Sequence, residues 1–152
     1  MNLKFQLALI FLSFTLVSFS QSNNKLPLPK GCVQLTPGEM QWIDTSSELA
    51  KGTKYCILYG DIKKAAPFAI RLQLPPNLVI KTHHHPNDEV VTVLDGSISV
   101  GFGDRTPSSE TKTFTANSFY VNAANVEHFV VVGSEGVTIQ INAVGPWVTT
   151  FK

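Results

Sequence analysis

Short hydrophobic runs, each ended by turn-forming residues, recur along most of the chain. Glycine, proline, asparagine or aspartate follows nearly every run, and β-branched residues are frequent within the runs. Runs of this length and even spacing are typical of the strands of an all-β sandwich or barrel. The sequence therefore predicts strands over residues 55–59, 68–74, 89–94, 97–102, 118–121, 128–132 and 137–144.

The alternation of apolar and polar side chains favours strands over helices. In residues 68–74 large apolar side chains occupy every second position, and Arg71 and Gln73 lie between them. A period of two places one set of side chains on each face of a sheet. Asp95 and Gly96 separate two of the predicted strands, and this pair favours the tight turn of a β-hairpin. We therefore expect residues 89–94 and 97–102 to pair with each other.

The first residues have the layout of a secretory signal peptide. Lys4 provides a basic start, residues 5–19 are mostly apolar, and small residues precede Gln21. A membrane anchor is the alternative, but the apolar run is shorter than the roughly 20 residues that a spanning helix needs. We expect residues 1–20 to be removed, and the mature protein to be exported to the periplasm or the extracellular space without a membrane span.

Composition and charge describe one globular domain without a basic surplus. The chain has 152 residues, of which 43% are hydrophobic and 15% charged, with 12 lysines and arginines against 11 aspartates and glutamates. This balance argues against binding to nucleic acid or to an anionic membrane. A domain of this size buries enough surface to fold without a metal or a disulfide, so a metal site would need a functional explanation. We assign residues 21–34 to an extended lead-in and residues 35–152 to the domain.

The two cysteines allow two interpretations. In an oxidising compartment Cys32 and Cys56 could form a disulfide. Alternatively, Cys56 is a small buried hydrophobic residue, because it lies inside the apolar run of residues 55–59. The sequence leaves both open.

Histidines and one glutamate form the most distinctive cluster of the sequence. Three of the four histidines are consecutive at residues 83–85, Glu89 follows, and His128 opens a later predicted strand. On an extended segment His83 and His85 project to one side and His84 to the other. Three imidazoles and a carboxylate suit divalent iron, manganese, nickel, copper or zinc. The alternative is a solvated tract that binds metals by chance.

The spacing His83-x-His85-x3-Glu89-x6-Gly96 resembles the first motif of the cupin superfamily. The second cupin motif is matched by His128 alone, with asparagines where cupins carry glycines, and the wider context resembles small exported bacterial cupins. The resemblance implies a double-stranded β-helix, a jelly-roll barrel that can pair into a homodimer. It also implies one divalent transition metal bound by His83, His85, Glu89 and His128, with His84 pointing away.

Three kinds of function follow from such a site. The first is a small-molecule metalloenzyme of the oxygenase, isomerase or lyase type, acting on an oxygen-bearing substrate. The second is that of a non-catalytic module of the cell envelope that binds a small ligand or a metal. The third is a structural role, in which the metal only rigidifies the barrel. Arg71 is a candidate clamp for a carboxylate or else an exposed strand residue. Further candidate pocket residues are Glu127, Tyr59, Tyr120, Gln140 and Asn142.

Overall fold

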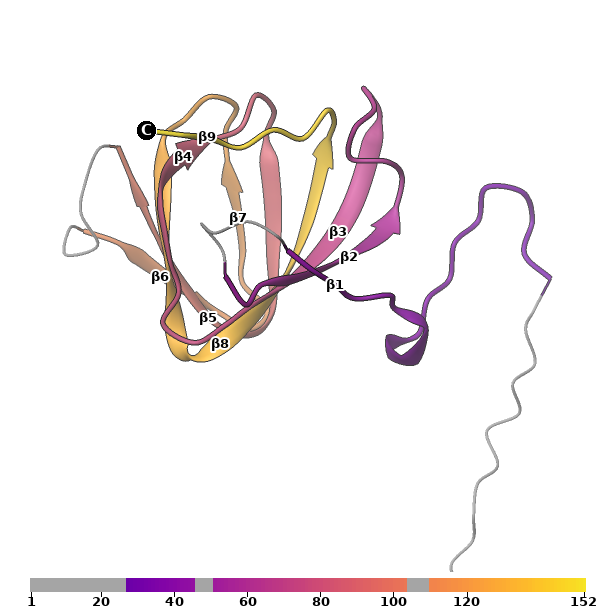
Figure 1. Cartoon of the computed structure of the whole chain (residues 1–152), viewed down its shortest axis with the longest axis horizontal. Helices are drawn as coiled ribbons and strands as arrows, with labels where there is room; N and C mark the ends of the chain where they lie inside the picture. Colours follow the sequence, from indigo (N-terminus) through magenta and orange to yellow (C-terminus); the bar gives the residue numbers. More distant parts are fainter. Residues whose placement is uncertain (1–26, 46–50, 104–109) are drawn as a thin grey trace, which may run out of the picture. The chain divides into compact units, whose positions relative to one another are not determined.

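A computed structural model of the chain describes residues 27–45, 51–103 and 110–152 (Figure 1). The predicted signal peptide, residues 1–20, and residues 21–26 of the predicted lead-in lie outside the described residues, so both stay predictions. Residues 32–152 cluster into one compact unit. Within the described ranges no helix has the length and apolar character needed to cross a membrane.

The compact unit is built from antiparallel strands that curl around a common interior (Figure 1). The strand order is β1-β2-β3-β8-β4-β9, and β5 pairs with β6, β7 and β8. The all-β jelly-roll prediction is confirmed. The elements are η1 (Pro37–Glu39), β1 (Ile43–Asp44), β2 (Lys54–Tyr59), β3 (Pro67–Leu74), β4 (Val79–His84), β5 (Glu89–Phe102), β6 (Lys112–Thr115), β7 (Phe119–Asn122), β8 (His128–Val144) and β9 (Thr150–Phe151).

The long strands β5 and β8 form the central ladder, and here the hairpin prediction is wrong. Residues 89–94 and 97–102 are one strand, β5, and both halves pair with β8. Gly96 does take the left-handed backbone conformation expected of a turn, with φ of 72°. Its effect is to bend a continuous strand, and register shifts lie on both sides of it. The predicted strands 128–132 and 137–144 are likewise one strand, β8.

Apolar side chains on the inner face of the sheet form the core. The alternation predicted for residues 68–74 holds, since Phe68, Ile70 and Leu74 are buried. Val91 and Val93 of β5 are fully buried. Alternate residues of β8 complete the cluster, so β3, β5 and β8 supply most of the hydrophobic stabilisation. The core members of β8 are Val130, Val132, Val137, Ile139 and Ile141.

The structure contains both cysteines as free thiols, with Cys32 exposed and Cys56 buried. Cys56 is 1% exposed and therefore packs as a small apolar residue of β2. Of the two interpretations that the sequence left open, the structure has the second.

The bend at Gly96 predicts a steep cost for any side chain there. An added Cβ would collide with the carbonyl oxygen of Gly136 and would be held at a positive φ. We expect Gly96→Ala to lower the free energy of unfolding by about 3 kcal/mol. Gly103→Ala is the control, because Gly103 also has a positive φ but has no atom within 4 Å of an added Cβ. It should cost about 1 kcal/mol. Urea denaturation checks both, and equal losses would contradict the steric argument.

Candidate metal centre

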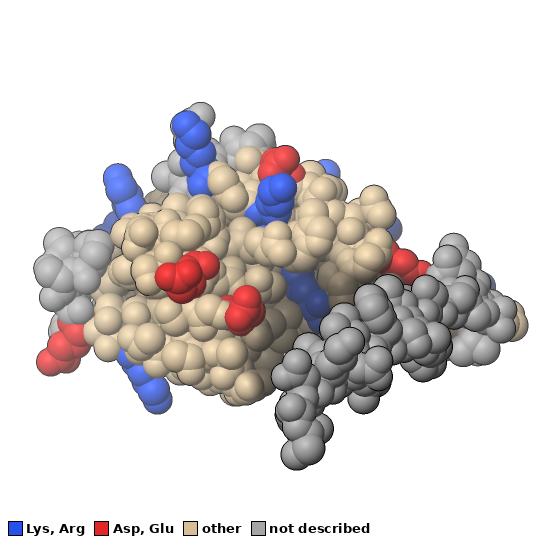
Figure 2. All heavy atoms as spheres, turned by 90° about the horizontal axis from the view of Figure 1, so that it is seen from below, with Lys and Arg blue, Asp and Glu red and all other residues tan. Residues whose placement is uncertain are grey.

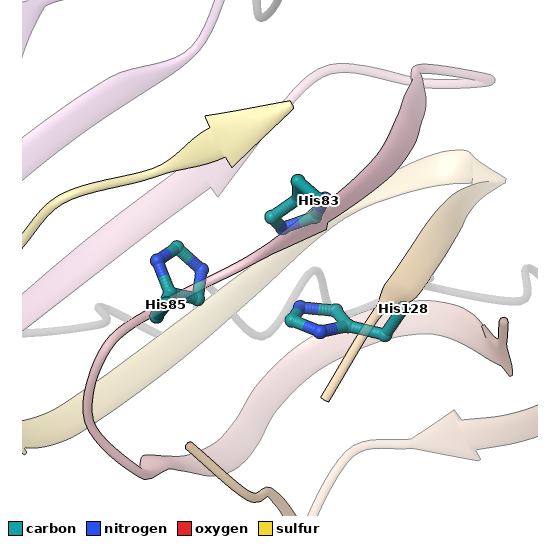
Figure 3. Close-up of side chains that lie close together, drawn as sticks. All are labelled: His83, His85 and His128. Atoms are coloured by element: carbon teal, nitrogen blue, oxygen red, sulfur yellow. The ribbon is translucent and has the colours of Figure 1, made fainter. Parts of the chain in front are cut away.

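Three histidines meet where strands β4 and β8 pair. His83 lies in β4 directly opposite His128, the first residue of β8. His85 follows the end of β4 on the same side as His83, as the alternation predicted. The ring centroids of His83 and His128 are 4.2 Å apart, and those of His83 and His85 are 5.2 Å apart. Figure 3 shows the three imidazoles turned toward one space between these segments.

Glu89 joins this group from the start of β5. One carboxylate oxygen, Oε2, is 3.4 Å from Nε2 of His128, and the other, Oε1, is 4.0 Å from Nε2 of His85. The turn between His85 and Glu89 prevented the sequence pattern from fixing the direction of this side chain. His84 is half-buried and does not belong to the three-histidine group.

Each histidine is oriented by a backbone carbonyl. A carbonyl oxygen can only accept a hydrogen bond, so each Nδ1 must carry the proton. The neutral ring then keeps a lone pair on Nε2, which is the form of histidine that binds metals. The Nδ1 atoms of His83, His85 and His128 lie 2.7, 2.9 and 3.0 Å from the carbonyl oxygens of Lys81, Val148 and Val126, respectively.

Burial favours the neutral forms of His83 and His85, and Glu89 stays charged. Desolvation lowers the pKa of His83 to about 4 and also lowers the pKa of His85. Burial alone would raise the pKa of Glu89, but hydrogen bonding by His128 and Asn122 and the electrostatic influence of His85 and His128 outweigh it and lower the pKa. At neutral pH the centre therefore holds a buried carboxylate beside the neutral rings of His83 and His85, and a bound cation would balance the negative charge.

The donor set fits a divalent transition metal. One ligand nitrogen from each of His83, His85 and His128 lies within 4.8 Å of the others. Nε2 of His128 is fully buried and has no hydrogen-bond partner. A buried nitrogen of this kind is costly unless something binds its lone pair. Three imidazole nitrogens with a carboxylate oxygen are the ligands that iron, manganese, nickel, copper and zinc accept.

The sequence matches no protein-family model and no curated protein. Solved structures do match. The polyketide cyclase RemF from Streptomyces resistomycificus superposes with a TM-score of 0.65 over 78% of this chain and 83% of its own, at 15% identity. The DMSP lyase DddQ from Ruegeria pomeroyi superposes with a TM-score of 0.60 over 76% of this chain and 62% of its own, at 14% identity. An RmlC-like cupin from Shewanella frigidimarina superposes with a TM-score of 0.57 over 73% of this chain and 89% of its own, at 16% identity. This chain has the cupin fold.

The cupin resemblance inferred from His83, His85 and Glu89 is thus confirmed at the level of the fold. The degenerate second motif keeps its turns, because Asn117 and Asn125 both adopt positive φ values, 69° and 61°. Asparagine tolerates this conformation better than other residues with a side chain.

Asn122 supports the glutamate of the cupin centre and was missed by the sequence analysis. It ends β7, lies opposite Glu89 in the ladder, and donates a hydrogen bond of 2.7 Å from Nδ2 to Oε2 of Glu89. The side chain is 2% exposed, and its Oδ1 is buried without a hydrogen-bond partner. Asn122 fixes one carboxylate oxygen and leaves the other free to face His85. Only the strand register reveals this pairing.

The segment after β8 packs against the histidines of the cupin centre. Trp147 stacks on His85 with ring centroids 4.0 Å apart and an angle of 18° between the planes. Phe151 of β9 lies 5.5 Å from the ring of His83, and β9 pairs with β4. Aromatic contacts from this segment therefore restrict the rotation of two imidazoles. The sequence contains no local signal for them.

The other candidate residues do not join the histidine group. Glu127 accepts a hydrogen bond of 3.2 Å from Nζ of Lys152, and Asn142 and Tyr59 are exposed. Tyr120 is half-buried against Phe114, and burial, helped by the charge of Glu89, raises the pKa of its phenol above the usual range. Arg71 and Gln140 line a different pocket, and Tyr59 also lines it.

The low pKa of His83 predicts that acid destabilises the metal-free protein. Folded His83 stays neutral down to about pH 4, whereas the ordinary pKa of histidine is 6.5. Between these values the unfolded chain binds more protons, so the free energy of unfolding falls as the pH drops, by about 3 kcal/mol from His83 alone. Urea denaturation of chelator-treated protein from pH 7 to 4 measures the loss. In the His83→Gln variant the free energy of unfolding should fall by less over this interval. A fall as large as in the wild type would contradict the low pKa of His83.

Proposed function

We propose that this chain is an exported metalloenzyme in which His83, His85, Glu89 and His128 bind one divalent transition metal. The observation that supports this most strongly is the convergence of three imidazoles, each held by a backbone carbonyl, beside a buried carboxylate. A structural role alone gives no reason for such a site, because a chain of this size buries a sufficient core without it.

The protein's own residues define what the centre does. A bound metal of this type supplies Lewis acidity or redox chemistry to an oxygen-bearing small molecule. Four protein ligands leave one or two positions for exchangeable groups when five or six are preferred. The backbone carbonyls orient the histidines, and Asn122 holds Glu89 in place. Two proteins of the same fold are, by name, a polyketide cyclase and a DMSP lyase. We therefore assign a small-molecule reaction of the oxygenase, isomerase or lyase type.

A non-catalytic binding module of the cell envelope is the second candidate. The observation that favours it is the burial of the whole ligand set, since His83, His85, Glu89 and His128 are 1–8% exposed. A buried site retains a metal well and gives a substrate little room. Turnover distinguishes the two candidates.

The proposal includes two properties of the mature protein. Residues 1–20 act as a signal peptide, so amino-terminal sequencing of the protein recovered from the envelope or the medium should begin at Gln21. The mature chain pairs into a homodimer, which its mass in solution measures.

Elemental analysis tests the metal centre. Protein purified without an affinity tag should contain about one equivalent of a divalent transition metal, and His83→Ala combined with His128→Ala should abolish binding. His84→Ala is the matched control from the same tract and should keep the metal. At a hundredfold excess of metal over the dissociation constant, binding raises the free energy of unfolding by about 3 kcal/mol. Metal content that is unaffected by the double substitution would refute the ligand assignment.

Turnover tests the enzymatic role. Metal-loaded protein should convert at least one member of a panel of enolisable, phenolic and carbohydrate substrates, and the double variant should be inactive. If the loaded wild-type protein binds panel members without converting any, the binding module replaces the enzyme. If the loaded protein neither binds nor converts them, the remaining interpretation is a structural one, in which the metal only stabilises the barrel.

A further inference from the structure

A second pocket lies outside the barrel core. It has a volume of about 380 Å³, between the segment that precedes β1 and strands β2, β3 and β8. Arg71 and Gln140 lie opposite each other in the β3–β8 ladder and alternate with the buried core residues Ile70 and Ile141. Because neighbouring residues of a strand face opposite sides, this pair projects from the outer face of the sheet. The pocket is therefore separated from the histidine centre by the core.

The walls of this outer pocket combine apolar and polar side chains, and one wall carries a cation. Tyr59 adds a phenol, and the apolar surface comes from five side chains: Val33, Leu35, Met40, Leu58 and Ala69. Arg71 is half-buried among them. A guanidinium in such surroundings is normally paired with a carboxylate, because desolvating an unpaired charge is costly.

Arg71 has contacts that orient it but none that neutralise it. Its Nε donates a hydrogen bond of 3.2 Å to Oε1 of Gln140, and one Nη lies 3.5 Å from Sδ of Met40. Across the described ranges, the ion pairs join other residues, and none includes Arg71. The guanidinium is thus held in place by a neutral amide, while its remaining donors are free to bind an anion.

We propose that the outer pocket binds a small monocarboxylate with an apolar body, such as a short fatty acid. The planar guanidinium of Arg71 pairs with the carboxylate through two parallel hydrogen bonds. The apolar part of the ligand lies along Leu35, Met40 and Leu58. The volume falls within the usual range of small-molecule sites, roughly 300–1,000 Å³. A second basic partner is not needed for a single negative charge.

The face of the molecule seen in Figure 2 does not supply a competing explanation for the arginine. Figure 2 shows basic and acidic side chains scattered over the visible face, without a continuous patch of one sign. A polyanion would be expected to contact several cations along one surface. A single oriented guanidinium over apolar side chains instead matches a ligand with one anionic end.

Methionine labelling gives a direct test in the full chain. The sequence has 2 methionines, Met1 and Met40, so ¹³C-methyl labelling gives a simple spectrum in which Met40 reports on the pocket. Octanoate should shift the Met40 signal in a saturable way. Arg71→Gln should weaken octanoate binding at least tenfold, and Arg71→Lys should give an intermediate affinity because it keeps the charge without the planar pair of donors. Octan-1-ol, which lacks the charge, should bind at least tenfold more weakly than octanoate.

Two control variants separate this site from the rest of the protein. Lys54→Gln removes an exposed charge of β2 outside the pocket and should bind octanoate as the wild type does. His128→Ala, which impairs the metal centre, should also leave octanoate binding unchanged, because the two sites lie on opposite faces of the sheet. Equal octanoate affinity in wild type and Arg71→Gln, equal affinity for octanol, or an unshifted Met40 signal would each overturn the proposal.

Discussion

The bend of the paired strands β5 and β8 is the constraint on which the site depends. Glu89 begins β5, whereas His128 lies opposite Phe102 at the other end of the same ladder. In a flat sheet, residues so far apart along a strand would be separated by roughly 40 Å. In the folded chain their side chains are 3.4 Å apart. The ladder must therefore roll back on itself, and Gly96 and Gly136, both at positive φ, mark the place where it turns.

Sequence patterns predicted the parts of the fold that depend on local periodicity. The hydrophobic runs located β2, β3, β5, β7 and β8 but not β1, β4, β6 or β9. Alternation put His83 and His85 on one side, because strand geometry alone determines that. The prediction of a hairpin at Asp95 and Gly96 was wrong, because this pair indicates a positive φ without determining whether the chain reverses or only bends. Asn122 and Trp147 were missed because their roles arise from contacts between distant segments, which single-sequence patterns do not contain.

One sheet carries two kinds of polar chemistry on its two faces. On the inner side, a buried carboxylate lies beside three imidazoles, and this arrangement attracts a cation. On the outer side, Arg71 is surrounded by neutral and apolar groups and attracts an anion. Arg71 and Gln140 alternate with core residues of β3 and β8, so the ladder that holds the core rigid also holds the outer pair in register. The two sites thus share a scaffold while remaining separated by packed side chains.

The backbone partners of the three histidines affect how the protein can change by mutation. In many metal sites a side-chain carboxylate or amide orients the imidazole, and one substitution removes it. Here the acceptors are the main-chain oxygens of Lys81, Val126 and Val148, which every amino acid possesses. Substitution at these positions can alter packing but cannot delete the acceptor. The side chains at these positions can therefore change during evolution while the backbone keeps the three imidazoles in the same orientation. New specificities can arise from such changes.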